Sequence, residues 1–336
     1  MGKPVRMADI AEQLNISVVS VSKALAGKPG VSEEMRAKVV ALARQMGYAG
    51  RSGSESGNAG GTGNIGVLVS DRFFNENTFY SNLYRSLVLS STGEGLTCML
   101  EIVSDEVEKA GQMPTLVTGR KVDGLIFMGN LDLDYLRAVT ASGLPCILLD
   151  FYIPCGPLDC VVSDNLEGGI ALTDHLLSQG CREIGFVGSI WATSSIMSRY
   201  LGYQQALRMA GIVPQEDWLL DDRDINGLFI PIQLPERLPR AFLCSCDEVA
   251  YNLVKSLQDR GLRVPEDVAV CGYDDFRYAT LSQPTLTTYQ VNVELMARMA
   301  VSHLAEQIRH ETNLGIRFTV PGKLVIRESS KIERRE

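Results

Sequence analysis

Residues 16–25, Ile16-Ser17-Val18-Val19-Ser20-Val21-Ser22-Lys23-Ala24-Leu25 (ISVVSVSKAL), decide how the start of this chain folds. Their β-branched side chains favour a strand, but their order fits a helix. Val21, Ala24 and Leu25 recur at helical spacing and share one face. Ser17 precedes them and can cap the first turn, because its hydroxyl can accept from a backbone N–H two or three residues later. We therefore predict a helix that leaves four side chains exposed: Val18, Val19, Ser22 and Lys23.

The segments on either side of this stretch are also typical of helices. Met7 to Leu14 carries apolar residues at helical spacing. Asn15 follows, and asparagine tolerates the left-handed backbone of a sharp turn. A third helix is predicted from about Glu33 to Met46, with Ser32 as its N-cap and acidic residues in its first turn. Together these form a helix-turn-helix arrangement, whose second helix enters the DNA major groove.

The exposed residues of the second helix help to distinguish a DNA-binding unit from a three-helix protein-interaction or capping module. Val18 and Val19 are poor solvent-facing residues but suit contact with thymine methyl groups. Lys23 can reach a guanine edge, and the serines can donate to phosphates. We therefore predict a DNA-binding head.

Charge is unevenly distributed along the chain. The first 51 residues hold eight basic and four acidic side chains, a net charge of +4, whereas the whole chain carries −8, which leaves −12 for the remainder. A basic head on an acidic body is typical of a nucleic-acid-binding module joined to a part that avoids nucleic acid.

Length and composition exclude several classes of protein. A chain of 336 residues is long enough for more than one domain. No apolar run is long enough to span a bilayer and the start does not resemble a signal peptide, so we expect a cytoplasmic protein with no membrane partner. Eight scattered cysteines and three histidines predict neither a disulfide framework nor a metal site.

The head and several later segments closely resemble the lactose-repressor (LacI/GalR) family. In the head the resemblance runs from Met7 through Gly27-Lys28-Pro29-Gly30-Val31-Ser32 to Tyr48. In the body the matching segments are IGVLV at 65–69, VDGLI at 122–126, RYLGY at 199–203, VPEDV at 264–268 and GYDD at 272–275. The resemblance covers nearly the whole chain and implies a transcriptional regulator.

This resemblance assigns the head residues to two groups. The family's base-reading positions are matched by Val18, Val19 and Lys23. Its phosphate-contacting positions are matched by Arg6, Ser17, Ser20, Ser22, Ser32 and Tyr48.

The segment after the head departs from the family pattern. The family usually follows the tyrosine with Pro-Asn and a short helix whose leucine wedges into the minor groove. Here residues 49–64 are rich in glycine and serine, with Gly57 at the leucine position. Gly53 and Gly57 together disfavour a two-turn helix by about 2 kcal/mol. We therefore predict a flexible linker at residues 50–64 and hypothesise that DNA kinking by a leucine wedge is absent.

Residues 65–330 alternate short apolar runs with helix-like stretches, which is typical of parallel, doubly wound α/β sheets. A segment of this length is better divided into two lobes than packed around one core. The predicted strands are 65–69, 97–102, 124–128, 146–149, 184–187, 241–244 and 268–271. The resemblance implies a helix-turn-helix domain at 1–49 and a periplasmic-binding-protein-like pair of subdomains, 65–162 with 290–318 and 163–289 with 319–330.

In such sheets a ligand binds beyond the carboxyl ends of the strands. The residues there combine carboxylates and an arginine with aromatic rings, which suits a polyhydroxylated ring. The predicted effector-binding residues are Phe74, Asp150, Tyr152, Trp191, Arg199, Cys246, Asp247 and Asp274.

The resemblance supports Asp150, Arg199 and Asp274, together with Asp247 or its neighbour Cys246. At the Cys246 position the family generally has asparagine, so one amide contact is missing. An aspartate that ends a strand is also often a turn or N-cap residue, which is the alternative for Asp150, Asp247 and Asp275.

Catalysis has little support in the sequence. We find no G-x-S-x-G elbow, Walker loop or H-E-x-x-H motif, and no histidine beside a candidate nucleophile. A sugar-processing enzyme with an appended DNA-binding head is the alternative from a different class.

We expect instead a regulator, and specifically a repressor, that needs no cofactor and binds operator DNA as a homodimer. A small carbohydrate between the two lobes is the expected effector. A purine or nucleoside effector, or a protein corepressor, are the alternatives within the same class.

Overall fold

The computed structural model describes residues 7–25, 30–46, 61–74, 78–225, 227–310 and 314–332. The chain divides into two compact units, Met1–Asn58 and Ala59–Glu336. Among the described residues, no helix combines the length and the apolar character needed to cross a membrane. The helical head and the parallel α/β sheets expected from the sequence are both confirmed.

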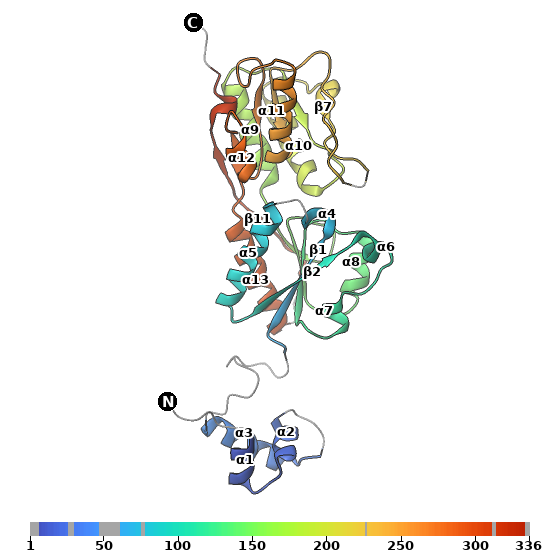
Figure 1. The fold of residues 1–336 in the computed structure, drawn as a ribbon, viewed down its shortest axis with the longest axis vertical. Helices are drawn as coiled ribbons and strands as arrows, with labels where there is room; N and C mark the ends of the chain where they lie inside the picture. The colour runs from blue at the N-terminus through green and yellow to red at the C-terminus, as the bar shows by residue number, and fades with distance from the viewer. Residues whose placement is uncertain are drawn as a thin grey trace. The chain divides into compact units, whose positions relative to one another are not determined.

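The first unit contains three helices, α1 (Met7–Leu14), α2 (Val18–Leu25) and α3 (Glu33–Gln45) (Figure 1). Asn15 joins the first two with φ of 51°, the left-handed conformation predicted for this turn. Ile10, Val21 and Val39 are fully buried, one from each helix. The quoted stretch is therefore a helix, because burying its face at helical spacing outweighs its strand propensity.

The first lobe of the second unit is built on a six-stranded parallel sheet, in the order β11-β5-β4-β3-β1-β2. Helices α5 (Thr78–Gly93) and α13 (Val293–His310) cover one face (Figure 1). The other face is covered by α7 (Thr115–Thr118) and α8 (Leu133–Thr140). Two short helices, α4 (Asp71–Phe74) and α6 (Asp105–Lys109), follow β1 and β2. The strands are β1 (Asn64–Ser70), β2 (Thr97–Val103), β3 (Gly124–Met128), β4 (Cys146–Leu149), β5 (Asp159–Ser163) and β11 (Arg317–Val320).

The second lobe has a four-stranded parallel sheet in the order β7-β6-β8-β9. Helices α9 (Asn165–Ser178) and α10 (Ser194–Met209) pack on one face, and α11 (Asp247–Asp259) packs on the other. Helix α12 (Arg277–Leu281) lies beside α11. The strands are β6 (Ile184–Val187), β7 (Leu219–Leu220), β8 (Ala241–Cys244) and β9 (Ala269–Cys271), and an antiparallel pair is formed by β10 (Thr288–Gln290) and β12 (Lys323–Val325). Single-turn helices occupy Glu216–Trp218 and Glu328–Ser330.

Two glycines allow α9 and α10 to approach closely. A Cβ at Gly169 would collide with the carbonyl oxygen of Arg199, and one at Gly202 would collide with the carbonyl oxygen of Leu166. This close packing fixes the position of α10, which carries Arg199 toward the carboxyl edge of the sheet.

The start of the second unit is held by one carboxylate. Asp123, just before β3, accepts hydrogen bonds from the backbone N–H groups of Thr62 and Gly63, both at 2.7 Å. The side chain of Asn64 donates to the carbonyl oxygen of Lys121 at 2.9 Å. The predicted linker at 50–64 lies outside the described residues from 50 to 60, as does the position expected for a leucine wedge.

Candidate functional site

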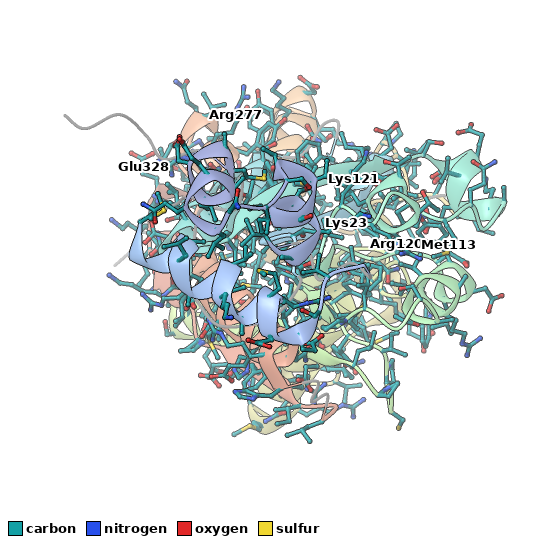
Figure 2. All side chains as sticks on the ribbon, turned by 90° about the horizontal axis from the view of Figure 1, so that it is seen from below. Lys23, Met113, Arg120, Lys121, Arg277 and Glu328 are labelled. Atoms are coloured by element: carbon teal, nitrogen blue, oxygen red, sulfur yellow. The ribbon has the colours of Figure 1, made fainter. Side chains whose placement is uncertain are left out.

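The outer face of α2 carries the side chains predicted to read DNA. Val18 and Val19 are 47% and 63% exposed, and Ser22 and Lys23 are exposed on the same helix. Figure 2 labels Lys23 on the helical unit. Two adjacent exposed valines at the start of a helix contribute nothing to the core of the head, so a role in contacting base edges is consistent with their position.

Three of the four serines predicted to contact phosphate lie at helix starts: Ser17, Ser20 and Ser32. Ser17 accepts a hydrogen bond from the backbone N–H of Ser20 at 3.0 Å, and the two hydroxyls are 2.9 Å apart. Ser32 accepts from the N–H of Met35 at 3.3 Å and caps α3. Both capping serines are exposed, so their hydroxyls can still donate to a phosphate. Arg6 and Tyr48, also predicted to contact phosphate, lie outside the described residues.

The carboxyl ends of the two larger sheets meet around a narrow cavity of about 60 Å³. It brings together four predicted effector residues, Asp150 from the first lobe and Arg199, Cys246 and Asp274 from the second. Ligand pockets usually measure about 300–1,000 Å³. The lobes must therefore separate, or side chains must move, before an effector can enter.

Arg199 lies at the centre of the polar groups around this cavity. Its guanidinium is 3.4 Å from Asp274 and donates to Asn165 at 2.8 Å and to the carbonyl oxygen of Ser245. It also stacks over the ring of Tyr273, 3.7 Å from the centroid. Burial acts to lower the pKa of Arg199, but Asp274 and its other neighbours outweigh this effect and raise it. The guanidinium is therefore held charged and in one orientation.

Asp150 presents an unsatisfied oxygen at this cavity. The hydroxyl of Tyr80 donates to Oδ2 at 2.8 Å, whereas the buried Oδ1 has no hydrogen-bond partner. Its backbone is left-handed, with φ of 70°, a strained conformation for an aspartate. Burial raises the pKa of Asp150 to about 6, against the opposing effects of Arg199 and Tyr80. A ligand that donates hydrogen bonds would satisfy this carboxylate.

Asp274 and Asp247 have different environments. Asp274 has φ of 106°, and burial raises its pKa to about 7 despite the nearby Arg199. Asp247 does not line the cavity; its carboxylate accepts from the backbone N–H of Phe276 at 2.9 Å, and its pKa is raised by burial and by Asp274. Asp247 therefore positions the loop after β9, as in the turn alternative, and its contact with an effector stays a prediction.

The three aromatic residues predicted to contact the effector do not line the cavity. Trp191 is 87% exposed. Phe74 packs edge-on against Tyr84, with ring centroids 6.4 Å apart, and Tyr152 lies under the guanidinium of Arg317. The cavity is lined instead by Phe73, Phe79, Tyr80 and Phe151.

Two residues that contact the polar groups of the cavity, Tyr80 and Asn165, were not singled out from the sequence. Tyr80 lies in the first turn of α5, where it has the apolar spacing of a core residue. Asn165 starts α9 and accepts a hydrogen bond from Arg199 Nε at 2.8 Å, although it does not line the cavity itself. Neither position follows a predicted strand, so only the three-dimensional packing reveals their roles. Burial raises the pKa of the Cys246 thiol to about 12, so this sulfur is a protonated thiol at neutral pH.

A second, larger chamber of about 360 Å³ adjoins this cavity, and Phe73 and Arg223 line both. Its walls come from α4 and α6 in the first lobe and from the segment after β7 in the second. The other lining residues are Asp71, Arg72, Ser104, Asp105, Glu106, Gly227, Leu228 and Phe229.

Comparison with known families agrees with this architecture. Residues 6–50 match the model for bacterial regulatory proteins of the lacI family, and residues 173–330 match a periplasmic binding protein-like domain. The chain belongs to the lacI family. This lacI-family protein is a DNA-binding transcriptional regulator and not an enzyme.

Relatives of this lacI-family regulator match it over nearly its full length. It is 27% identical to the HTH-type transcriptional repressor PurR of Photobacterium profundum, covering 96% of this chain and 98% of the relative. It is 25% identical to catabolite control protein A of Priestia megaterium, covering 97% and 99%.

Solved structures of two regulators share the fold. The lac repressor dimer bound to operator and the anti-inducer ONPF matches with a TM-score of 0.69 at 23% identity, covering 98% of this chain and all of the repressor chain. The complex of the transcriptional regulator CelR with cellobiose also has a TM-score of 0.69, at 22% identity, covering 97% and 99%.

Proposed function

We propose that this lacI-family regulator is a repressor that acts in the cytoplasm as a homodimer, with operator affinity set by a small carbohydrate bound between its lobes. The observation that carries the effector proposal is the buried group of Asp150, Arg199 and Asp274 at the meeting of the two sheets. Paired carboxylate and guanidinium groups bind vicinal hydroxyls, while aromatic rings contact the apolar face of a sugar.

The proposed domain organisation follows the same reasoning. Residues 1–49 form the DNA-binding domain, 50–64 the linker, and 65–330 the effector-binding and dimerisation domain with its two subdomains. Two heads joined through their bodies gain effective concentration on a pseudopalindromic operator. Exposed apolar side chains on α5 and β2, Val88, Leu89 and Ile102, provide surface that a second copy can cover.

A purine or nucleoside effector is the second candidate. Phe73, Phe79 and Tyr80 line the cavity, and aromatic rings can stack on a base as readily as on a sugar. The same carboxylates can accept hydrogen bonds from ring nitrogens.

A thermal-shift screen of the full chain against sugars and nucleosides tests the effector proposal. A ligand at 100 times its dissociation constant stabilises the folded state by about 2.7 kcal/mol. We expect a sugar to raise the unfolding temperature, and Asp150→Ala or Arg199→Ala to abolish the rise. A nucleoside hit with the same dependence would replace the carbohydrate with a base, and a hit insensitive to both variants would move the site elsewhere.

Selection from a randomised DNA library tests the role of α2. We expect a pseudopalindromic site whose preference is relaxed in the Val18→Ala/Val19→Ala variant. Because valines contact bases and not phosphates, the salt dependence of affinity should stay unchanged. Lys38→Ala is the matched control, since this lysine on α3 is exposed and pairs with Glu34 at 2.9 Å. Equal sequence preference in the valine variant and the wild type would refute base reading by Val18 and Val19.

A further inference from the structure

The narrow inner cavity and the larger outer chamber together form the cleft. Each arginine that lines the cleft forms an ion pair with a carboxylate. Within the described ranges there are three of them, Arg72, Arg199 and Arg223. Arg72 contacts Glu108 at 2.5 Å, Arg199 lies 3.4 Å from Asp274, and Arg223 contacts Asp222 at 2.5 Å. Glu108, Asp222 and the side chain of Asp274 are buried or nearly so. An anionic ligand would therefore have to compete with a carboxylate for each of these three arginines.

Carboxylates outnumber these arginines. The chambers are lined by three guanidinium groups and by five carboxyl groups. The carboxyl groups belong to Asp71, Asp105, Glu106, Asp150 and Asp274. One of the two oxygens of Asp150 is buried without a hydrogen-bond partner. Among the described residues, the cleft therefore has an unused hydrogen-bond acceptor and no arginine without a carboxylate partner.

An anionic ligand would meet two costs in this cleft. To reach Arg199 in the inner cavity, a phosphate or carboxylate must displace Asp274, whose buried carboxyl group then loses its cationic partner and must take up a proton. A phosphate at the far end of a longer ligand would lie in the outer chamber, beside Asp71, Asp105 and Glu106. Hydroxyl or amino groups meet neither cost, because they donate to the carboxylates that are present.

We propose that the cleft selects effectors that are uncharged or positively charged and rejects phosphorylated or carboxylated ones. This inference rests on the proposed function and narrows its ligand class: sugar phosphates, sugar acids and nucleotides are excluded, whereas free sugars, amino sugars and nucleosides are admitted. In the inner cavity the exclusion of anions depends on Asp274, because its carboxyl group lies beside the guanidinium of Arg199 that an anion would otherwise bind.

Inorganic phosphate is a probe that tests this rule without a known effector. The full chain is unfolded thermally in sodium phosphate and in sodium chloride of equal ionic strength, and the transition of the body is followed. We expect no phosphate-specific stabilisation of the wild type. We expect Asp274→Asn to gain it, because Arg199 then lacks its anionic partner, and the added change Arg199→Ala to remove it again.

Three controls make each result decisive. Asp134→Asn removes an exposed carboxylate outside both chambers and should behave as the wild type. Circular dichroism shows whether Asp274→Asn folds, and Asp274→Ser repeats the test if it does not. Phosphate-specific stabilisation of the wild type that Arg199→Ala removes would overturn the proposal. A folded Asp274 variant that gains none would overturn the role assigned to Asp274.

A matched ligand series separates this rule from the proposed function. A hexose, its amino derivative and its phosphate ester are compared by thermal shift, together with a nucleoside and its monophosphate. Stabilisation by the free or amino form, with at least a tenfold weaker affinity for the ester, supports both ideas. Tighter binding of a phosphate ester overturns the charge rule alone. If no sugar binds but the nucleoside binds better than its monophosphate, the carbohydrate proposal fails and the charge rule holds.

Discussion

Replacing Gly202 by alanine should destabilise the body and displace Arg199. In an ordinary helix interior this change is favourable by about 0.5–1 kcal/mol. At Gly202 the added Cβ would collide with the carbonyl oxygen of Leu166 and would lie 2.9 Å from the backbone nitrogen of Ile170. Both are backbone atoms of α9, so no side chain can move aside. Helix α10 itself must shift.

The size of the effect follows from these opposing contributions. Overpacking costs about 1–3 kcal/mol, and the gain in helix propensity offsets part of it. A net loss of about 1–2 kcal/mol lowers the unfolding temperature by about 2–8 °C in a domain of this size. Arg199 lies three residues earlier on the same face of α10, so its contacts with Asn165 and Asp274 should lengthen.

Thermal unfolding of the full chain, followed by near-ultraviolet circular dichroism, measures this change. Gly93→Ala is the matched control, because a Cβ at this helical glycine meets no atom within 4 Å. The control should keep or slightly raise the unfolding temperature. If Gly202→Ala is as stable as Gly93→Ala and binds effector as tightly as the wild type, the close-packing argument is wrong.

Three further predictions concern pH, helix capping and thiol reactivity. Burial raises the pKa of Asp150 to about 6 and of Asp274 to about 7 from 3.8, so the folded state binds more protons than the unfolded state between these values. The body should therefore lose stability as pH rises from about 4 to 7, and Asp274→Asn should flatten this slope in thermal unfolding at several pH values. Ser17→Ala should lower the stability of the head by about 1 kcal/mol. Ser17→Asp should retain the cap but weaken operator binding in a mobility-shift assay, and equal DNA affinity would argue against a phosphate nearby. In a timed alkylation followed by mass spectrometry, the exposed Cys155 should react well before Cys246, whose thiol is protonated and only partly exposed.

The buried strands were predictable because they are continuous apolar runs. The predicted bounds 124–128, 146–149, 184–187 and 241–244 agree with β3, β4, β6 and β8. The strands that were missed are short or lie at sheet edges: β7 has two residues, and β11 alternates exposed and partly buried side chains. β5 was missed too, although it is fully buried, because only the three residues between Asp159 and Ser163 are apolar.

The polar part of the cleft was predictable for a different reason. Parallel strands end at one edge, so the residues that follow them converge there whatever the details of packing. This rule places Asp150, Arg199 and Asp274 among the candidates, and the family resemblance selects them; their contact with an effector stays a prediction. The choice of Phe74, Tyr152 and Trp191 does not match the aromatic lining of the cavity. Which aromatic side chains face the cavity depends on contacts between segments that are distant in sequence.

The hydrogen bonds that Thr62 and Gly63 donate to Asp123 limit how effector binding can affect the start of the second unit. These bonds hold the chain at the amino ends of β1 and β3, whereas the cavity lies beyond the carboxyl ends of the same strands. The seven residues of β1 separate the two points by about 23 Å. An effector in the cavity would therefore not contact Thr62 or Gly63. We expect effector binding to change the position of these two residues only if β1 or the first lobe moves with them.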